Sequence, residues 1–242
     1  MSALGRPRLH LRETDSTNER ARELAEAGAP HGTLVTASVQ TAGRGRQGRR
    51  WEAPAGTALL CSLLVRRFDD LLSLRAGLAV ADVAGEEALV KWPNDVLLDG
   101  RKVAGVLVEG RPQGGWAVVG IGINVALDVA ALGPEASERA GSLGRPRSAL
   151  EPALVELLGA LERWLEAPAE EALAALRTRD ALLGQAVSWS GGSGVGAGID
   201  ASGGLRVRPE RRGTGALRGG GAPGLSAGDG GWWRRRTSTA AG

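Results

Sequence analysis

Residues 91–110 read KWPNDVLLDGRKVAGVLVEG, with an apolar run on each side of Asp99-Gly100. An Asp-Gly pair between two such runs predicts a β-hairpin with a type I′ turn, because both central residues of that turn need a positive φ. With a two-residue loop, Asp95 pairs with Ala104, and Lys102 lies diagonally across from Asp95 on the same face of the hairpin.

Lys102 and Asp95 are opposite charges on an otherwise apolar hairpin. Their diagonal separation of roughly 7–8 Å between backbones is one that a lysine side chain spans. One interpretation is a surface ion pair, which contributes about 0–1 kcal/mol to stability. The other is a functional pair that faces a ligand. The hairpin pattern alone leaves both interpretations open.

The composition is that of a globular protein. The 242 residues are 43% hydrophobic and 24% charged, with a net charge of +3, which gives no support by itself to a nucleic-acid-binding role. No run approaches the roughly 18 apolar residues of a membrane span, and the first residues lack the apolar core of a signal peptide, so we expect a cytoplasmic protein. The single Cys61 excludes an internal disulfide and a cysteine-rich metal site, and we expect no metal bound directly by a protein motif.

A helix with a polar start is expected near the N-terminus. Residues 13–28, ETDSTNERARELAEAG, place Ser16 as a cap with a glutamate three residues later, and Gly28 is a suitable C-terminal stop. Ser16, Thr17 and Asn18 have two interpretations. They only cap the helix, or their hydroxyl, amide and backbone N–H groups form a polar ligand site.

Residues 43–50, GRGRQGRR, hold three glycines and four arginines after an expected strand at 32–40. Glycine lets the backbone approach a ligand closely, and arginine supplies forked donors that match phosphate oxygens. We interpret the segment as an anion-binding loop, because four arginines without an acid repel one another unless an anion is present. A solvated loop and an RNA-binding Arg-Gly segment are the alternatives.

Apolar periodicity predicts the remaining elements. It indicates strands at 57–66 and 116–125 and helices at 71–89, 148–164 and 170–183. Glycines at 120 and 122 indicate close approach of a ligand to the second strand, or else a bulge or a packed helix. From Gly184 the composition changes, and residues 185–207 predict short strands with turns at 191–193 and 201–204.

Three blocks together resemble the signature blocks of biotin–protein ligases. They are residues 43–51 (GRGRQGRRW), residues 91–95 (KWPND) with 101–105 (RKVAG), and residues 120–124 (GIGIN). They occur in the family's order with compatible spacing, and Ser16-Thr17-Asn18 matches the family's helix start. The resemblance extends over about residues 9–208.

The resemblance implies an α/β fold of the α+β type. A catalytic domain with a mixed sheet is expected at residues 1–183, followed at 184–208 by the start of a small SH3-like β-barrel. Residues 209–242 form an atypical Gly/Arg-rich tail, and we expect an incomplete barrel, as a frame-shifted 3′ end would produce. Because the matching region begins almost at Met1, we expect a monofunctional ligase without the DNA-binding domain of some members, and no sequence-specific DNA binding.

The family resemblance also implies a two-step ligase reaction. Biotin and ATP, with Mg²⁺, give biotinyl-5′-adenylate and pyrophosphate, and biotin then passes to a lysine of a biotin carboxyl carrier domain of a carboxylase such as acetyl-CoA carboxylase. The alternatives are a lipoate or octanoate ligase of the same fold, and a non-catalytic biotin- or nucleic-acid-binding module. No membrane partner is expected, and a homodimer is compatible with the sequence.

The family pattern assigns a role to individual residues of this chain. Lys102, Asp95 and Arg46 are the expected catalytic residues. The expected biotin-binding residues are Ser16, Thr17, Asn18, Gln40, Arg44, Gly45, Arg46, Lys102, Gly105 and Gly122. The residues expected at ATP and the adenylate are Arg46, Arg49, Trp51, Asn94 and Asn124.

Overall fold

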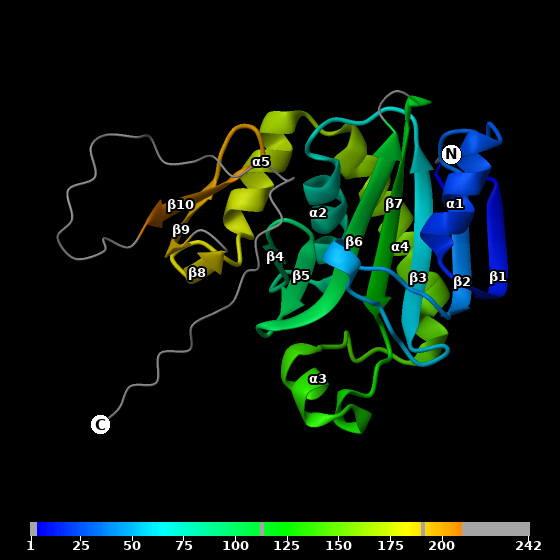
Figure 1. Ribbon diagram of the computed structural model, residues 1–242, viewed down its shortest axis with the longest axis horizontal. Coiled ribbons are helices and arrows are strands. Elements are labelled where there is room, and N and C mark those ends of the chain that lie inside the picture. The colour runs from blue at the N-terminus through cyan, green and yellow to red at the C-terminus, as the bar shows by residue number, and fades with distance from the viewer. Residues whose placement is uncertain (1–3, 112–113, 190–191, 210–242) are drawn as a thin grey trace.

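The computed structural model describes residues 4–111, 114–189 and 192–209. Within them lie a seven-stranded mixed sheet and a separate three-stranded antiparallel sheet (Figure 1). The large sheet has the order β1-β2-β3-β7-β6-β5-β4, in which β1 and β2 are parallel and all other neighbours are antiparallel. Its strands are β1 (Arg8–Thr14), β2 (Leu34–Gln40), β3 (Ala58–Val65), β4 (Leu89–Lys91), β5 (Asp95–Leu98), β6 (Arg101–Arg111) and β7 (Trp116–Asn124). The expectation of an α/β fold with a mixed sheet is confirmed.

Helices cover both faces of the large sheet. The helices are α1 (Thr17–Glu26), α2 (Leu72–Ala84), α3 (Pro134–Arg139), α4 (Leu150–Glu166) and α5 (Ala169–Thr178). Successive side chains of the buried strand β3 point to opposite faces of the sheet, so they show which helices cover each face. Leu64 packs in a cluster with Ala21 of α1, whereas Leu63 belongs to the main core with α2 and α4. We call these the α1 face and the α2 face.

Most predicted elements are present, with shifted ends. The helix expected at 71–89 ends at Ala84, because Gly85 has φ 115°, and β4 follows it. The helix expected at 170–183 ends at Thr178, because the next residues pair with β4. Val90 N donates to Arg179 O at 2.7 Å, and Ala181 N donates to Val90 O at 3.1 Å. Strand β1 and helix α3 were not predicted.

Helix α1 begins where expected but without the expected capping box. Ser16 occupies the N-cap with an extended backbone, yet its side chain makes no capping hydrogen bond, so that part of the prediction is wrong. Gly28 follows the helix with φ 87°, as predicted for a C-terminal stop. Ser16 is buried and lines a cavity.

The hairpin turn is confirmed, and its register differs from the prediction by one residue. Asp99 and Gly100 both have positive φ, 51° and 73°. Asp95 pairs with Gly105 and not with Ala104, because a β-bulge inserts Val103 as an extra residue in β6. The bulge turns Ala104 to the opposite face, and places a glycine beside Asp95.

The small sheet consists of β8 (Ala186–Trp189), β9 (Gly192–Ile199) and β10 (Leu205–Pro209), in the order β10-β9-β8. The turn between β9 and β10 touches the large domain, where the indole Nε1 of Trp92 donates to Gly203 O at 2.9 Å. The turn expected at 201–204 is confirmed, whereas Gly192 belongs to β9 and Gly191 lies outside the described residues. The tail at 210–242 also lies outside them.

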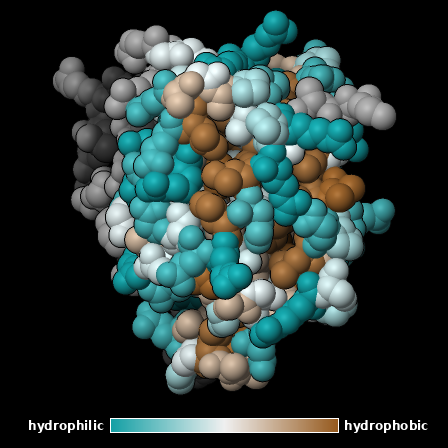
Figure 2. Space-filling view, turned by 90° about the vertical axis from the view of Figure 1, so that its right-hand side faces the viewer, coloured by the Kyte–Doolittle hydropathy of each residue, from teal (hydrophilic) through white to brown (hydrophobic). Residues whose placement is uncertain are grey.

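Strand β1 forms one edge of the large sheet, and its side of the molecule faces the viewer in Figure 2. Apolar residues are exposed there among hydrophilic ones, and Leu9 of β1 is 39% exposed. None of the helices in the described part of the chain could span a membrane.

Candidate active site

A cavity lies on the α1 face of the sheet, beside the N-terminus of α1. Its floor is formed by β6 and β7, where Gly105 pairs with Gly122. Glycine is needed at two positions of β7 because side chains pack directly on the backbone there. A Cβ at Gly122 would lie 2.5 Å from the Trp51 ring, and one at Gly120 would lie 2.0 Å from Asn18 Oδ1. The lining residues are 16–18, 40, 44–47, 49–51, 91–95, 102, 105–107 and 120–122.

Lys102 and Asp95 form an ion pair on the floor of this cavity. Lys102 Nζ lies 2.7 Å from Asp95 Oδ1, and the two side chains are 35% and 20% exposed. The bulge brings Gly105 opposite Asp95, and a Cβ there would lie 3.2 Å from Lys102 Nζ. An ammonium group that is held by a carboxylate and still borders a cavity is a fixed positive charge for an anionic ligand.

The Arg-Gly loop folds back on itself above the ion pair. Gly45 N donates to Arg49 O at 2.7 Å, and Trp51 N donates to Gly43 O at 3.0 Å. Burial lowers the pKa of Arg46, and the charge of Asp95 opposes that shift. Arg46 lines the same cavity as Asp95 and stays charged, since arginine ionises far above neutral pH.

Trp51 closes the cavity from the loop side. Its ring lies over Gly122 and Gly105, with Lys102 Nζ 5.6 Å from the ring centroid. Trp51 Nε1 is buried and has no hydrogen-bond partner in the described part of the chain. The ring thus forms an apolar wall of the cavity that rests on these two glycines.

The end of the cavity next to α1 is a polar recess. Gln40 Oε1 accepts from Thr17 N at 2.7 Å and from Thr17 Oγ1 at 3.0 Å. Beneath them, the fully buried Ser62 of β3 donates to Asn18 Oδ1 at 2.6 Å, with its Oγ 2.7 Å from Thr17 Oγ1. This network fixes the orientation of the Thr17 and Asn18 side chains.

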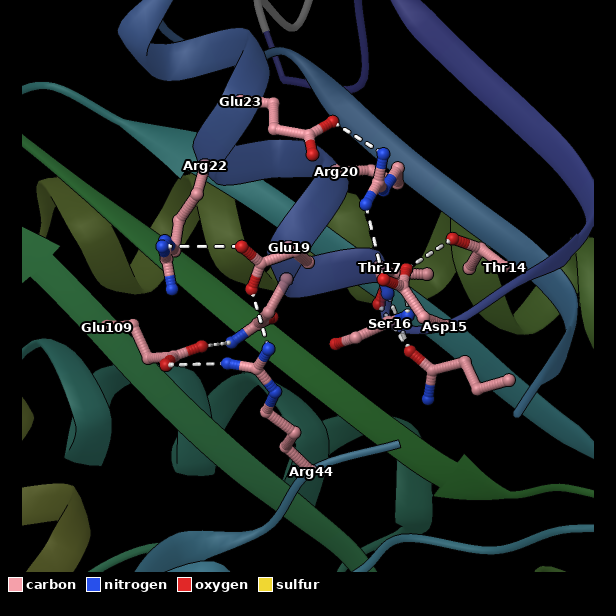
Figure 3. Close-up of polar contacts among 12 residues, drawn as sticks. Thr14, Asp15, Ser16, Thr17, Glu19, Arg20, Arg22, Glu23, Arg44 and Glu109 are labelled. Carbon is pink, nitrogen blue, oxygen red and sulfur yellow. Dashed lines mark hydrogen bonds and ion pairs between the residues drawn. The ribbon is translucent and has the colours of Figure 1, made fainter. Parts of the chain in front are cut away.

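Glu109 of β6 connects the recess to the Arg-Gly loop. Glu109 Oε2 accepts from Asn18 Nδ2 at 2.7 Å, and Glu109 Oε1 lies 3.9 Å from a guanidinium nitrogen of Arg44. Figure 3 shows Arg44 reaching between Glu109 and Glu19, and Arg44 Nη2 lies 2.7 Å from Glu19 Oε2. Arg22 lies 3.3 Å from the other oxygen of Glu19.

The structure gathers every predicted site residue except Asn124 around this one cavity. Asn124 is buried, and its Nδ2 donates to Gly141 O at 2.9 Å. Its contact with the adenylate stays a prediction, as do the individual roles of the other residues. Asn94, which does line the cavity, donates through Nδ2 to Val106 O at 3.0 Å.

Two residues of the site were missed from the sequence. Ser62 gave a signal, because it is a hydroxyl in the apolar strand ALLCSLLV. Glu109 gave none, because its partner Arg44 is 65 positions earlier in the chain. In the described residues, no group of three or more His, Cys, Asp or Glu side chains is placed to hold a metal ion.

Comparisons with known proteins agree with this geometry. The Biotin/lipoate A/B protein ligase family model matches residues 11–126. A biotin–[acetyl-CoA-carboxylase] ligase of Paracoccus denitrificans is 38% identical over 223 residues, covering 82% of this chain and 92% of that protein. The bifunctional ligase/repressor BirA of Bacillus subtilis is 42% identical over 122 residues, which are 46% of this chain and 38% of BirA.

A solved structure covers nearly the whole fold. The biotin protein ligase from Aquifex aeolicus, in complex with biotin and ATP, superposes with a TM-score of 0.75 at 28% identity. The match covers 96% of this chain and 100% of that one. The motif resemblance is therefore confirmed by sequence relatives and by a structure. The chain belongs to the biotin/lipoate protein ligase family and, within it, to the biotin–protein ligases.

Proposed function

We propose that this protein activates biotin with ATP and transfers it to a lysine of a biotin carboxyl carrier domain of a carboxylase. The observation that carries the proposal is the position of the Lys102–Asp95 pair. It borders the same cavity as the polar recess at Thr17 and the loop that bears Arg46 and Arg49. A ligand with a polar head and a carboxylate fits a cavity that holds these groups together.

The first step joins two anions. A carboxylate oxygen of biotin attacks the α-phosphorus of ATP, an O–P bond forms, and pyrophosphate leaves with the electrons of the broken bond. No proton moves in this step, so the protein mainly offsets charge repulsion and aligns the reactants. Lys102, Arg46 and Arg49 supply the positive charge, Asp95 holds Lys102 in place, and Mg²⁺ accompanies the phosphates of ATP.

In the second step, the neutral amine of the carrier lysine attacks the carbonyl carbon of the mixed anhydride. An amide bond forms, AMP leaves, and the nitrogen loses a proton. A mixed anhydride hydrolyses readily, so the site must exclude water. The loop at 44–51, with Trp51 as its apolar wall, is suited to covering the adenylate.

The recess suits the ureido ring of biotin, which offers two N–H donors and one carbonyl acceptor. Ser16, Thr17 and Gln40 bring hydroxyl, amide and backbone groups to this place. Gly45, Gly105 and Gly122 line the same cavity, and we propose that the rest of the biotin molecule approaches their backbone closely. Asn94 and Asn124 are proposed near the adenosine.

Adenylate formation tests this function. The protein is incubated with ATP, Mg²⁺ and either biotin or lipoate, and the adenylate is detected by mass spectrometry. Biotinyl-adenylate is expected. Lipoyl-adenylate without biotinyl-adenylate would reject biotin in favour of a lipoate or octanoate ligase.

A non-catalytic nucleic-acid-binding module would behave differently. It would form no adenylate, and it would show salt-sensitive binding of DNA or RNA that survives Arg46→Ala and Lys102→Ala.

The full chain and a chain ending at Arg208 are then compared for biotin transfer to a purified carrier domain. A catalytic domain at 1–183, a partial barrel at 184–208, a cytoplasmic location, a homodimer and the lack of DNA binding stay predictions.

A further inference from the structure

We propose that Glu109 is a positioning residue that couples the Arg-Gly loop to the polar recess, with Glu19 as the second anchor of that loop. The carboxylate of Glu109 accepts a hydrogen bond from Asn18 and forms an ion pair with Arg44. The consequence for biotin rests on the proposed function, whereas the anchoring of the loop does not.

The amide of Asn18 is fully engaged by the protein. Asn18 Oδ1 accepts from Ser62 Oγ at 2.6 Å, and Nδ2 donates to Glu109 Oε2 at 2.7 Å and to Leu107 O at 3.3 Å. A hydroxyl on one side and two acceptors on the other settle which way the amide points. The side chain is 3% exposed and lies directly over Gly120. Glu109 therefore determines the position of a recess residue without bordering the recess itself.

The guanidinium of Arg44, which lines the cavity, is held by two carboxylates. Its guanidinium lies 2.7 Å from Glu19 on α1 and 3.9 Å from Glu109 on β6 (Figure 3). The backbone of Arg44 forms an isolated antiparallel β-bridge with Arg50, at the other end of the loop. The ion pairs of Arg44 therefore fix both ends of the loop. The charge of Arg44 is thus balanced by two acids.

The two anchors differ in the residues that they contact, and this difference allows their effects to be separated by experiment. Glu19 contacts the loop through Arg44, and it also pairs with Arg22 on the same helix. Glu109 contacts the loop and Asn18. Loss of Glu19 should therefore affect the loop alone, whereas loss of Glu109 should affect the loop and the recess. Because coupling between two sites is reciprocal, filling the recess should also protect the loop through Glu109.

The loop is measured in the ligand-free protein by limited trypsin digestion, because trypsin cuts after arginine. Mass spectrometry follows fragments that end at residues 44–50. Partly exposed ion pairs of this kind contribute modestly, so Glu19→Gln and Glu109→Gln should each raise the cleavage rate about two- to fivefold. The matched control is Glu23→Gln, which removes an equivalent pair with Arg20 on the same helix at 2.7 Å and should leave the rate unchanged.

The recess is measured by biotin affinity in calorimetry. Glu109→Ala removes the charged acceptor of Asn18 and should weaken biotin binding about tenfold. Glu19→Gln should change it by less than about twofold. Thermal unfolding of each variant separates these effects from a loss of folded protein.

Each result bears on a separate statement. Unchanged loop cleavage in both Gln variants would overturn the anchoring of Arg44, and unchanged biotin affinity in Glu109→Ala would overturn the coupling to Asn18. Wild-type protein that binds no biotin would reject the proposed function and with it the coupling to biotin, while the digestion would still decide the anchoring.

Discussion

The Lys102–Asp95 ion pair is partly exposed, and pairs of this kind contribute about 0–1 kcal/mol to folding. The same pair borders the cavity in which the proposed reaction brings two anions together. The energy does not separate the two interpretations of the hairpin, because a surface ion pair contributes the same amount. The position of the pair beside the cavity is what favours the functional interpretation.

Lys102→Ala should therefore lose activity and keep its fold. Removing one preorganised charge or donor that acts on the transition state typically lowers kcat by about 10²–10³-fold, and we expect a loss of that size in biotinyl-adenylate formation. Stability in urea should change by about 1 kcal/mol or less. The control is Arg101→Ala, the adjacent basic residue at the hairpin turn, which is exposed. Near wild-type adenylation by Lys102→Ala would show that another cation performs this task.

Cys61 gives a prediction about pH. Burial in β3 raises its pKa to about 12, so its thiol remains protonated throughout the usual range. In the folded protein it should react with iodoacetamide far more slowly than in urea, where one thiol per chain should be labelled. An unfolded thiol ionises near pH 8.5–9, so this residue lowers the stability of the fold as the pH rises from about 9 to 12. Fast labelling of the native protein at pH 8 would contradict this.

At the scale of elements, the turn of the hairpin is determined by its own sequence, whereas the register of its strands depends on the neighbouring strands of the sheet. Asp99 and Gly100 specify their own turn, because positive φ is a local requirement. The bulge at Val103 could not be predicted, because alternation counts residues and cannot show where one is inserted. It is required by neighbours, since Gly105 must lie opposite both Asp95 and Gly122.

Glycine positions in β7 give an element-scale prediction. In Gly120→Ala the new Cβ would lie 2.0 Å from Asn18 Oδ1, so the amide must leave its place in the recess. Biotin affinity should then fall by about tenfold or more, as measured by calorimetry. The prediction is wrong if the variant binds biotin as tightly as the wild type.

Gly159→Ala is the control for adding a methyl group. Gly159 lies inside α4, where nothing lies within 4 Å of the added Cβ. Alanine in an exposed helix interior should stabilise the protein by about 0.5–1 kcal/mol. Thermal unfolding should show a higher Tm by a few degrees, with unchanged biotin affinity.

At the scale of the whole molecule, the sequence identified the site through its motifs because their residues are close together in the chain. It missed Glu109 and the contact of the small sheet, because those residues meet partners far away in sequence. Strand β1 was missed for a related reason. Its residues are mostly exposed, so burial imposes no apolar pattern on them.

The small sheet is joined to the active-site hairpin by one turn. Trp92 Nε1 donates to Gly203 O, and Trp92 is three residues before Asp95. Gly203 has φ 83° and lies against the start of α2, where a Cβ would lie 2.5 Å from Cδ2 of the N-cap residue Leu71 and 3.1 Å from Leu74 Cδ1. Asp200 Oδ1 fixes the turn by accepting from Ser202 N and Gly204 N. The turn thus supports the segment that carries Asp95 from outside the large sheet.

Gly203→Ala should therefore weaken both stability and adenylation. A non-glycine residue at this φ lowers the free energy of unfolding, as measured in urea, by about 1–3 kcal/mol. The added methyl group must also displace the side chain of Leu71, which contacts the turn. Gly198→Ala is the matched control, because Gly198 also has a positive φ of 94° but its Cβ would lie 3.9 Å from the nearest side chain, that of Leu183. Both variants should lose stability through backbone strain, yet only Gly203→Ala should lower the adenylation rate, assayed well below its Tm. Equal adenylation rates in the two variants would mean that the docked turn stabilises the molecule without supporting Asp95.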